Sequence, residues 1–349
     1  MIASPRHRST GDSMRRAGAA GPAGIGMIQN APSTRRRLIS LGASLLLLGG
    51  GCIRPAEIPD LNTDELALVL SRLVLQPRMT CAELRRSFGV EYLPLVDTPD
   101  EIGLRYGEFW VPTDDGELLR VWYLPSKLQR GVVILSGGAA GTLPCFLFHA
   151  QLLVDNGWSV VMYEYRGFGE STGAPDITTL PTDLEAVLDW TRAQIGGRPV
   201  TLMGISLGSV PSIAVAAARP QAVNGLVLDS PVAMASELSR LDFVLGDRTQ
   251  EFIDRLPKNL VSERVIARVH QPLLVLAGQE DALTTPATVQ DLFNRAGGPR
   301  SLVLFPGIDH ARAIFVDTGT YAYAVESFLS AIWDQREPLQ IEIIADRGP

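Results

Sequence analysis

Six short apolar runs, each followed by a stretch with helical spacing, limit the folds open to this chain more than any other feature. Each run holds three or four residues with almost no polar interruption, which is typical of strands buried on both faces of a parallel sheet. The runs cover residues 132–135, 159–162, 200–203, 226–228, 273–276 and 302–304. The intervening helices would cover both faces of that sheet.

Two further strands precede these runs. Residues 105–111 and 117–123 alternate between apolar and polar positions, and Asp114-Asp115-Gly116 supplies a turn between them, so an antiparallel hairpin is expected. The sequence therefore predicts an α/β fold with a mostly parallel sheet of eight strands and helices on both faces. In such sheets the functional residues lie beyond the carboxyl ends of the strands.

The pentapeptide Gly204-Ile205-Ser206-Leu207-Gly208 lies at one of these carboxyl ends. It follows the run at 200–203 and precedes a helical run of small residues at 209–218. A G-x-S-x-G pattern between a strand and a helix places a serine hydroxyl at the tip of a sharp turn. The turn leaves no room for a side chain at position 204 or 208, and Ser206 is expected in a strained backbone conformation.

Four segments together resemble the α/β-hydrolase superfamily over roughly residues 104–334. Besides the turn at 204–208, residues 163–173 resemble its D-Y-R-G-x-G-x-S-x-G loop. Residues 278–281 and 307–310 resemble its G-x-x-D and G-x-x-H motifs. The combination is similar to the small esterase and serine-aminopeptidase-like branch, which has a short helical lid.

The resemblance implies a particular chemistry. A serine at the turn, rather than an aspartate, argues against the dehalogenase and epoxide-hydrolase branches. It implies transfer of an acyl group from an ester, thioester or amide through a covalent acyl-enzyme. The family order of serine, acid and histidine agrees with the order in this chain. No cofactor is expected, and the cysteine count gives no metal-site spacing.

Elimination among the four histidines selects the general base. His7 lies in the amino-terminal leader, His149 lies in a helical run, and His270 precedes a strand at its amino end. His310 alone follows a strand at its carboxyl end, in a loop rich in Gly and Asp. His310 is therefore predicted to take the proton from Ser206 and to return it to the leaving group.

The acid that orients this histidine is predicted to be Asp281, which follows the strand at 273–276. Three other carboxylates remain as alternatives. Glu280 is adjacent, Asp229 ends the strand at 226–228 where a minority of the family places the acid, and Asp309 precedes His310 directly. Turn formation or helix capping is the better explanation for these three.

An oxyanion hole requires two backbone N–H groups. One is expected from Leu207, and the other from the glycine-rich loop at 136–141, with Gly138 as the predicted donor and Ala139 as the nearest alternative. The family usually has H-G-x in this loop, whereas this chain has Ser136 at the histidine position. A phosphate-binding loop is the other interpretation of the glycines, but no G-K-[ST] follows them.

The lid is expected at about residues 231–270, between two strands of the sheet. Its apolar side chains either line a pocket for an acyl group or pack inward. They are Leu238, Leu241, Phe243, Val244, Leu245, Phe252, Ile253 and Leu256.

Residues 1–51 are predicted to be an export leader. They hold seven arginines and one acid, a net charge of +6, so the remaining residues carry −13 when the whole chain carries −7. Arg35-Arg36-Arg37 precedes an apolar run at 38–48 and three glycines, which is the pattern of a signal sequence. The run is shorter than the ~20 residues that span a bilayer.

Cys52 follows the leader and resembles the lipid-accepting cysteine of bacterial lipoproteins, although Gly49 stands where that pattern has leucine. A plain cleaved signal is the alternative. Residues 34–39 also resemble a twin-arginine export motif, and the long stretch before them indicates a start at Met14 or Met27.

The segments that flank the hydrolase-like domain at 104–335 are short. Residues 52–103 are predicted to be a linker and a helix, with Leu66, Val69, Leu70 and Leu73 on one apolar face. Cys81 and Cys145 either pair, as an exported protein allows, or stay unpaired. The tail at 336–349 includes a candidate short strand at 339–344.

These patterns together predict a serine hydrolase of the cell envelope or periplasm, most simply an esterase acting on a small acyl substrate. A peptidase or an acyltransferase would use the same three side chains. A binding protein that keeps the fold without catalysis is the rival class. The acidic body argues against a nucleic-acid partner, and membrane attachment would come only through a lipid on Cys52.

Overall fold

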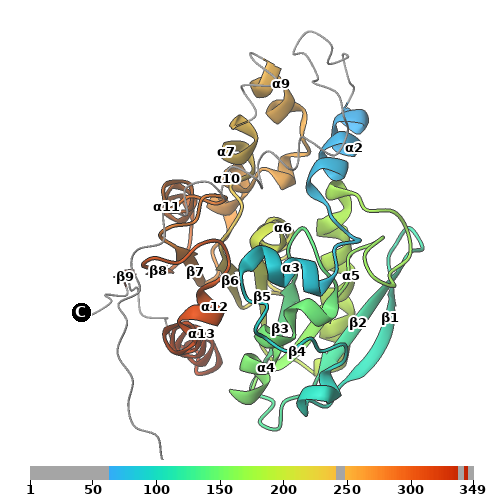
Figure 1. The fold of residues 1–349 in the computed structure, drawn as a ribbon, viewed down its shortest axis with the longest axis vertical. Coiled ribbons are helices and arrows are strands. Elements are labelled where there is room, and N and C mark those ends of the chain that lie inside the picture. The colour runs from blue at the N-terminus through green and yellow to red at the C-terminus, as the bar shows by residue number, and fades with distance from the viewer. Residues whose placement is uncertain (1–62, 241–247, 337–341, 345–349) are drawn as a thin grey trace, which may run out of the picture. The chain divides into compact units, whose positions relative to one another are not determined.

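The computed structural model describes residues 63–240, 248–336 and 342–344. These residues form one nine-stranded sheet in the order β1-β2-β4-β3-β5-β6-β7-β8-β9 (Figure 1). The strands are β1 (Gly107–Pro112), β2 (Leu118–Leu124), β3 (Val132–Ser136), β4 (Ser159–Tyr163), β5 (Val200–Ile205), β6 (Gly225–Asp229), β7 (Leu273–Gly278), β8 (Arg300–Phe305) and β9 (Glu342–Ile344). The eight expected strands are all present, and the predicted fold class is confirmed.

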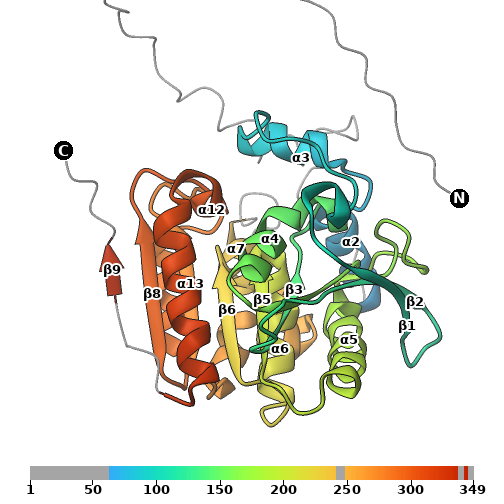
Figure 2. The same ribbon diagram turned by 90° about the horizontal axis from the view of Figure 1, so that it is seen from below.

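The strand directions agree with the sequence pattern. β1 and β2 form the expected hairpin, and β2 pairs antiparallel with β4. The strands from β4 through β8 pair in parallel. The short tail strand β9 adds a further parallel pairing beyond β8 (Figure 2).

Helices cover both faces of the sheet, as the uninterrupted apolar strands require. α4 (Leu147–Asp155) and α13 (Thr318–Trp333) lie on one face, and α6 (Ser209–Ala218) and α11 (Pro286–Arg295) lie on the other (Figure 1). Consecutive strand residues enter opposite cores: Leu202 packs with the α6 side, and Met203 packs with the α13 side. Each fully buried side chain of this size contributes about 1.5–3 kcal/mol.

The chain order places a topological switch point between β3 and β5. From β3 the chain crosses to β4 on one side, and then returns to place β5 on the other side of β3. The register pairs Ser136 with Gly204 at the carboxyl ends of these two strands. Loops that leave such neighbouring strands in opposite directions open a crevice for ligands.

Short helices form the segment between β6 and β7. They include α7 (Met234–Ser239), α9 (Arg248–Arg255) and α10 (Ser262–Val265). Of the apolar lid residues named from the sequence, Leu238, Phe252, Ile253 and Leu256 are buried in the main core, so they pack inward. Leu241, Phe243, Val244 and Leu245 lie outside the described residues.

An amino-terminal segment packs on the domain through α2 (Thr63–Val74) and α3 (Cys81–Phe88). Leu70 is buried in the main core, and the Ser71 hydroxyl accepts a hydrogen bond from the Ile177 backbone amide at 2.9 Å. Cys81 and Cys145 form a disulfide. This pairing, which the sequence left open, ties the start of α3 to the loop that precedes α4.

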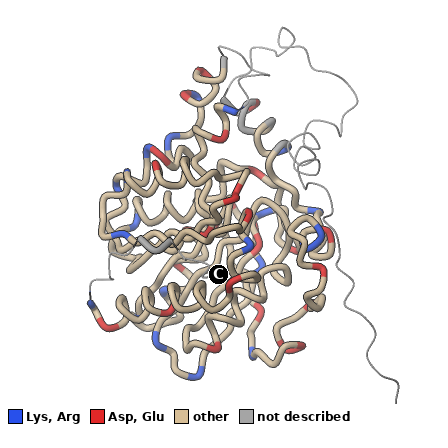
Figure 3. The backbone as a smooth tube through the Cα atoms, turned by 60° about the vertical axis from the view of Figure 1, so that its left-hand side comes forward, with Lys and Arg blue, Asp and Glu red and all other residues tan. Residues whose placement is uncertain are grey.

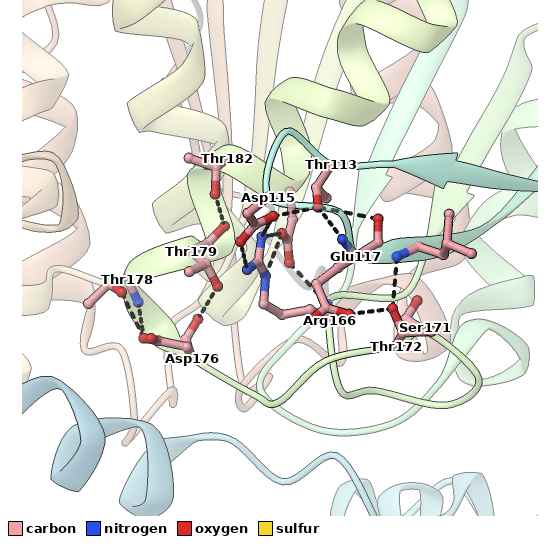
Figure 4. Close-up of polar contacts among 12 residues, drawn as sticks. Thr113, Asp115, Glu117, Arg166, Ser171, Thr172, Asp176, Thr178, Thr179 and Thr182 are labelled. Atoms are coloured by element: carbon pink, nitrogen blue, oxygen red, sulfur yellow. Dashed lines mark hydrogen bonds and ion pairs between the residues drawn. The ribbon is translucent and has the colours of Figure 1, made fainter.

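Arg166 joins three parts of the domain (Figure 4). Its guanidinium donates to the Asp183 carboxylate on α5 (Leu180–Ile195) at 2.6 and 2.8 Å, and to Asp115 in the hairpin turn at 2.6 Å. The hydrogen bond from Arg166 lowers the pKa of Asp115 to about 2, whereas burial raises the pKa of Asp183. The loop after β4, which resembled a family motif, is therefore anchored at its arginine.

The disulfide should stabilise the domain by restricting the unfolded chain. Because Cys81 and Cys145 are 64 residues apart, the Cys81→Ser/Cys145→Ser variant is expected to lose about 4 kcal/mol of unfolding free energy by the loop-entropy relation. Urea denaturation followed by circular dichroism measures this loss. Reduction of the wild type should reproduce it, and the double variant should not respond to reductant. Equal unfolding midpoints for the variant and the oxidised wild type would contradict this expectation.

Candidate active site

The turn between β5 and α6 has the strained geometry that the sequence predicted. Ser206 has φ +52°, in the left-handed region that costs a residue with a side chain about 1–3 kcal/mol. A Cβ atom on Gly204 would lie 2.4 Å from the Gly208 carbonyl oxygen, and one on Gly208 would lie 2.2 Å from the Ser136 carbonyl oxygen. Both glycines are therefore required by the close approach of backbone at this turn.

Three side chains from three different loops meet at the carboxyl edge of the sheet. The Nε2 atom of His310 lies 2.8 Å from the Oγ atom of Ser206. The Nδ1 atom of His310 lies 2.8 Å from the Oδ2 atom of Asp281. Asp281 follows β7 and His310 follows β8, and their exposed fractions are only 2% and 6%. The structure brings together the serine, histidine and aspartate that the sequence named.

The Asp281 carboxylate is held from both oxygen atoms. Oδ1 accepts hydrogen bonds from the backbone amides of Leu283 and Thr284, each at 2.9 Å, and Oδ2 accepts one from the Thr284 hydroxyl at 2.7 Å. Burial alone would raise the pKa of Asp281, but the hydrogen bond and charge of His310, with the Thr284 bonds, lower it. An ionised carboxylate accepts only, so Nδ1 of His310 carries a hydrogen and Nε2 can accept the Ser206 hydroxyl proton.

The alternative acids lie elsewhere. Asp229 accepts hydrogen bonds from the Tyr321 hydroxyl at 2.9 Å and the Ser230 hydroxyl at 3.2 Å. Asp309 accepts from the backbone amide of His310 at 2.7 Å, and Glu280 is exposed. Among the described residues, only Asp281 places a carboxylate against the His310 ring.

The other described histidines are away from Ser206. His149 is buried in α4, with Nε2 at 3.9 Å from a carboxylate oxygen of Asp229. His270 lies before β7, at the opposite edge of the sheet, and its ring is close to Gly297. His7 lies outside the described residues. Among the described histidines, only His310 has a ring nitrogen within hydrogen-bonding distance of Ser206.

Backbone amides are available beside Ser206. A Cβ atom on Gly138 would lie 3.7 Å from the Ser206 Cβ atom, so the loop after β3 passes directly over the serine. Within the described part of the chain, the amides of Gly138 and Ala139 donate no hydrogen bond. Leu207 follows Ser206 in the first turn of the 3₁₀ segment. The two predicted donors thus flank the serine, and the loop amides can serve a ligand oxygen.

Sequence patterns did not reveal that Arg240 and Glu237 of the lid lie beside the loop that carries Asp281. Arg240, at the end of α7, donates to the Leu283 carbonyl at 2.7 Å and to Glu237 at 2.9 Å. Burial raises the pKa of Glu237 to about 7, with Arg240 opposing the rise and Asp281 adding to it. The Oε1 atom of Glu237 is buried with no hydrogen-bond partner in the described chain. Glu237, as the one charged residue of α7, was the only available signal.

Two further expectations concern metals and membranes. Over residues 63–240, 248–336 and 342–344, the structure contains no cluster of His, Cys, Asp and Glu that could hold a metal ion. No helix within these ranges has the length and hydropathy needed to cross a bilayer. Cys52 and the leader lie outside the described residues, so the lipidation and export predictions stay predictions.

Comparisons with known proteins agree with this fold. The model of the alpha/beta hydrolase fold family matches residues 131–261. An uncharacterized protein of Mycobacterium tuberculosis is 32% identical over 225 residues, which cover 63% of this chain and 78% of that protein. The alpha/beta hydrolase domain-containing protein WAV2 of Arabidopsis thaliana is 27% identical over 57% of this chain and 69% of its own length.

A solved structure shows the same fold at lower sequence identity. The esterase from Pyrococcus furiosus superposes with a TM-score of 0.58 at 19% identity, over 69% of this chain and 96% of that chain. With the sequence matches, this establishes that the chain belongs to the α/β-hydrolase superfamily. The fold and these neighbours support a hydrolase.

The raised pKa of Glu237 gives a pH-dependent stability with a defined sign. Between its ordinary value of 4.5 and about 7, the unfolded chain releases this proton while the folded chain keeps it, so rising pH destabilises the wild type. Glu237→Gln removes this dependence. Its stability relative to wild type should grow by roughly 1–2 kcal/mol from pH 5 to pH 7, allowing for partial exposure. Urea denaturation at several pH values measures this difference, and a constant difference would contradict the assignment.

Proposed function

We propose that this protein is a serine hydrolase that cleaves carboxylic esters through a covalent acyl-enzyme. Ser206 is the nucleophile, His310 is the general base and acid, and Asp281 orients and stabilises the histidine. The observation that carries the proposal is the continuous row of 2.8 Å contacts from Ser206 through His310 to Asp281. The amides of Gly138 and Leu207 are the proposed oxyanion hole.

The reaction follows from these positions. His310 Nε2 takes the hydroxyl proton as Ser206 Oγ attacks the ester carbonyl carbon. The carbonyl oxygen becomes negatively charged, and the two backbone amides stabilise that charge where it develops. His310 then protonates the leaving alcohol, and the carbon–oxygen bond to it breaks. Water, deprotonated by the same histidine, attacks the acyl-enzyme and releases the acid and free Ser206.

An ester is the proposed target because the fold matches that of a protein named as an esterase, from Pyrococcus furiosus. The strained serine turn adds support, since Ser206 at φ +52° projects from the tip of the turn instead of lying along the strand. A small acyl compound is the proposed substrate class. A peptidase or acyltransferase would use the same groups, and a panel of esters, peptides and acceptor alcohols separates these activities.

Export and a lipid on Cys52 remain proposals that rest on the leader. Nucleic acid is not a proposed partner, because the chain outside the leader carries a large negative charge. Figure 3 shows acidic and basic residues scattered together over the described chain. Mass spectrometry of the mature amino terminus tests the lipid, because an unmodified terminus well before residue 52 would exclude it.

The catalytic proposal is tested by removing the nucleophile. Ser206→Ala should lower hydrolysis of short-chain p-nitrophenyl esters by at least about 10⁴-fold, as loss of a catalytic serine does in other hydrolases. The same change should abolish covalent labelling by a fluorophosphonate. Ser239→Ala is the matched control, because Ser239 is exposed on α7 and, within the described residues, its hydroxyl bonds to the Ala235 carbonyl of its own helix alone. The control should keep wild-type activity and labelling. A folded wild type that neither hydrolyses esters nor becomes labelled would contradict the proposal.

A further inference from the structure

The loop between β3 and α4 is held at two of its carbonyl groups. The Tyr165 hydroxyl donates a hydrogen bond to the Gly137 carbonyl at 3.0 Å. The Gln76 backbone amide donates one to the Ala139 carbonyl at 2.7 Å, and Gln76 forms a parallel β-bridge with Ala140. Neither contact involves Ser206, His310 or Asp281. Both act on the loop that passes over Ser206.

Peptide geometry carries the Tyr165 contact to the Gly138 amide. The Gly137 carbonyl and the Gly138 N–H belong to one planar trans peptide unit, so they point in opposite directions. Holding the carbonyl toward Tyr165 therefore fixes the direction of the Gly138 N–H. A hydrogen bond to the carbonyl also polarises the peptide unit and strengthens its N–H as a donor.

Tyr165 is placed rigidly for this contact. Its side chain is 3% exposed, and its ring packs edge-on against Tyr163 at 5.1 Å and Phe168 at 5.6 Å between ring centres. Burial raises the pKa of the Tyr165 phenol, so the hydroxyl stays protonated as a donor. The next residue, Arg166, anchors the loop after β4, which carries Tyr165, through its bond to Asp183. The Tyr165 side chain is therefore already fixed in the position from which its hydroxyl donates to the Gly137 carbonyl.

Gln76 is positioned from outside the sheet. It follows the buried Leu75 at the end of α2, and five residues later Cys81 forms the disulfide with Cys145. Cys145 lies a few residues beyond the same loop. The amino-terminal segment is thus joined to this part of the chain at two points, by the Gln76 backbone hydrogen bond and by the disulfide.

We propose that Tyr165 is a positioning residue for the oxyanion hole, and that the Gln76 amide, through the Ala139 carbonyl, restrains the same β3–α4 loop from the amino-terminal segment. This inference rests on the proposed function, because it concerns how well the loop amides meet the oxyanion. Contacts that act only on the developing charge affect kcat and leave KM nearly unchanged.

Tyr165→Phe tests the inference, since it removes one oxygen atom and keeps the ring. With p-nitrophenyl acetate, kcat should fall about 10- to 100-fold, less than or equal to the loss of a whole oxyanion donor. KM should stay within about twofold of the wild type. The rate of fluorophosphonate labelling should fall in parallel, because the phosphonyl oxygen uses the same amides.

Thr191→Val is the matched control for a lost buried hydroxyl. Thr191 is fully buried in α5, and its hydroxyl donates to a main-chain carbonyl, that of Val187, at 2.7 Å. This bond has the same chemistry as the Tyr165 contact but lies near the amino edge of the sheet. The control should keep kcat within about twofold while losing stability.

A second pair of variants separates the backbone amide of Gln76 from its side chain, because both variants remove the side chain and only one removes the amide hydrogen. Gln76→Pro removes the amide hydrogen, whereas Gln76→Ala keeps it. Only the proline variant should lower kcat, and circular dichroism confirms that each variant is folded. If Gln76→Pro does not fold, Tyr165→Phe decides the proposal alone.

The outcomes separate the two proposals. If wild type is active, Ser206→Ala is inactive and folded Tyr165→Phe keeps kcat within about twofold, the positioning role is overturned while the hydrolase remains. A raised KM with unchanged kcat in Tyr165→Phe also overturns it, because that indicates substrate contact. A wild type that shows no hydrolysis and no labelling overturns both.

Discussion

The structure of the candidate site depends on one contact, the 2.8 Å approach of His310 Nε2 to Ser206 Oγ. These residues are 104 positions apart, and no local sequence preference can join them. The parallel sheet does so, because the register of β5, β6, β7 and β8 brings the carboxyl ends of all four strands to one edge. The apolar strands thus serve function by fixing the separation of the loops that leave them. Loss of register by one residue would turn each strand's side chains to the opposite face.

The same close packing links the strained serine to the loop beside it. Gly208 lies so near the Ser136 and Gly137 carbonyls that any side chain there would displace the loop. That loop is in turn held by Tyr165 and by the segment tied through Cys81 and Cys145. We therefore propose that the amino-terminal segment stabilises the domain through the disulfide and restrains the loop beside Ser206 through the Gln76 amide. The backbone strain at Ser206 persists because these surrounding contacts over-determine the turn.

Much of the fold and of the candidate site could be predicted from the sequence, because the strands and the serine turn each have a local sequence pattern. Uninterrupted apolar runs predicted the parallel strands, and the glycines at 204 and 208 predicted the turn. His310 could be chosen by its strand end alone. The contacts of Tyr165 with Gly137 and of Arg240 with Leu283 could not be predicted, because each joins residues 28 or more positions apart through backbone carbonyls that have no sequence signature. The pairing of Cys81 with Cys145 was undecided for the same reason, because their separation along the sequence does not indicate their distance in the folded protein.

The central claim is that Ser206 attacks an acyl carbon and carries the acyl group as a covalent intermediate. The most direct measurement combines a rapid acid quench during turnover of p-nitrophenyl acetate with peptide mapping by mass spectrometry. We expect a burst of p-nitrophenol equal to the enzyme concentration, and an acetyl group on the peptide that contains Ser206, localised to that side chain. An acetyl group found on another residue, or product formed with no acylated enzyme at any time, would contradict the claim.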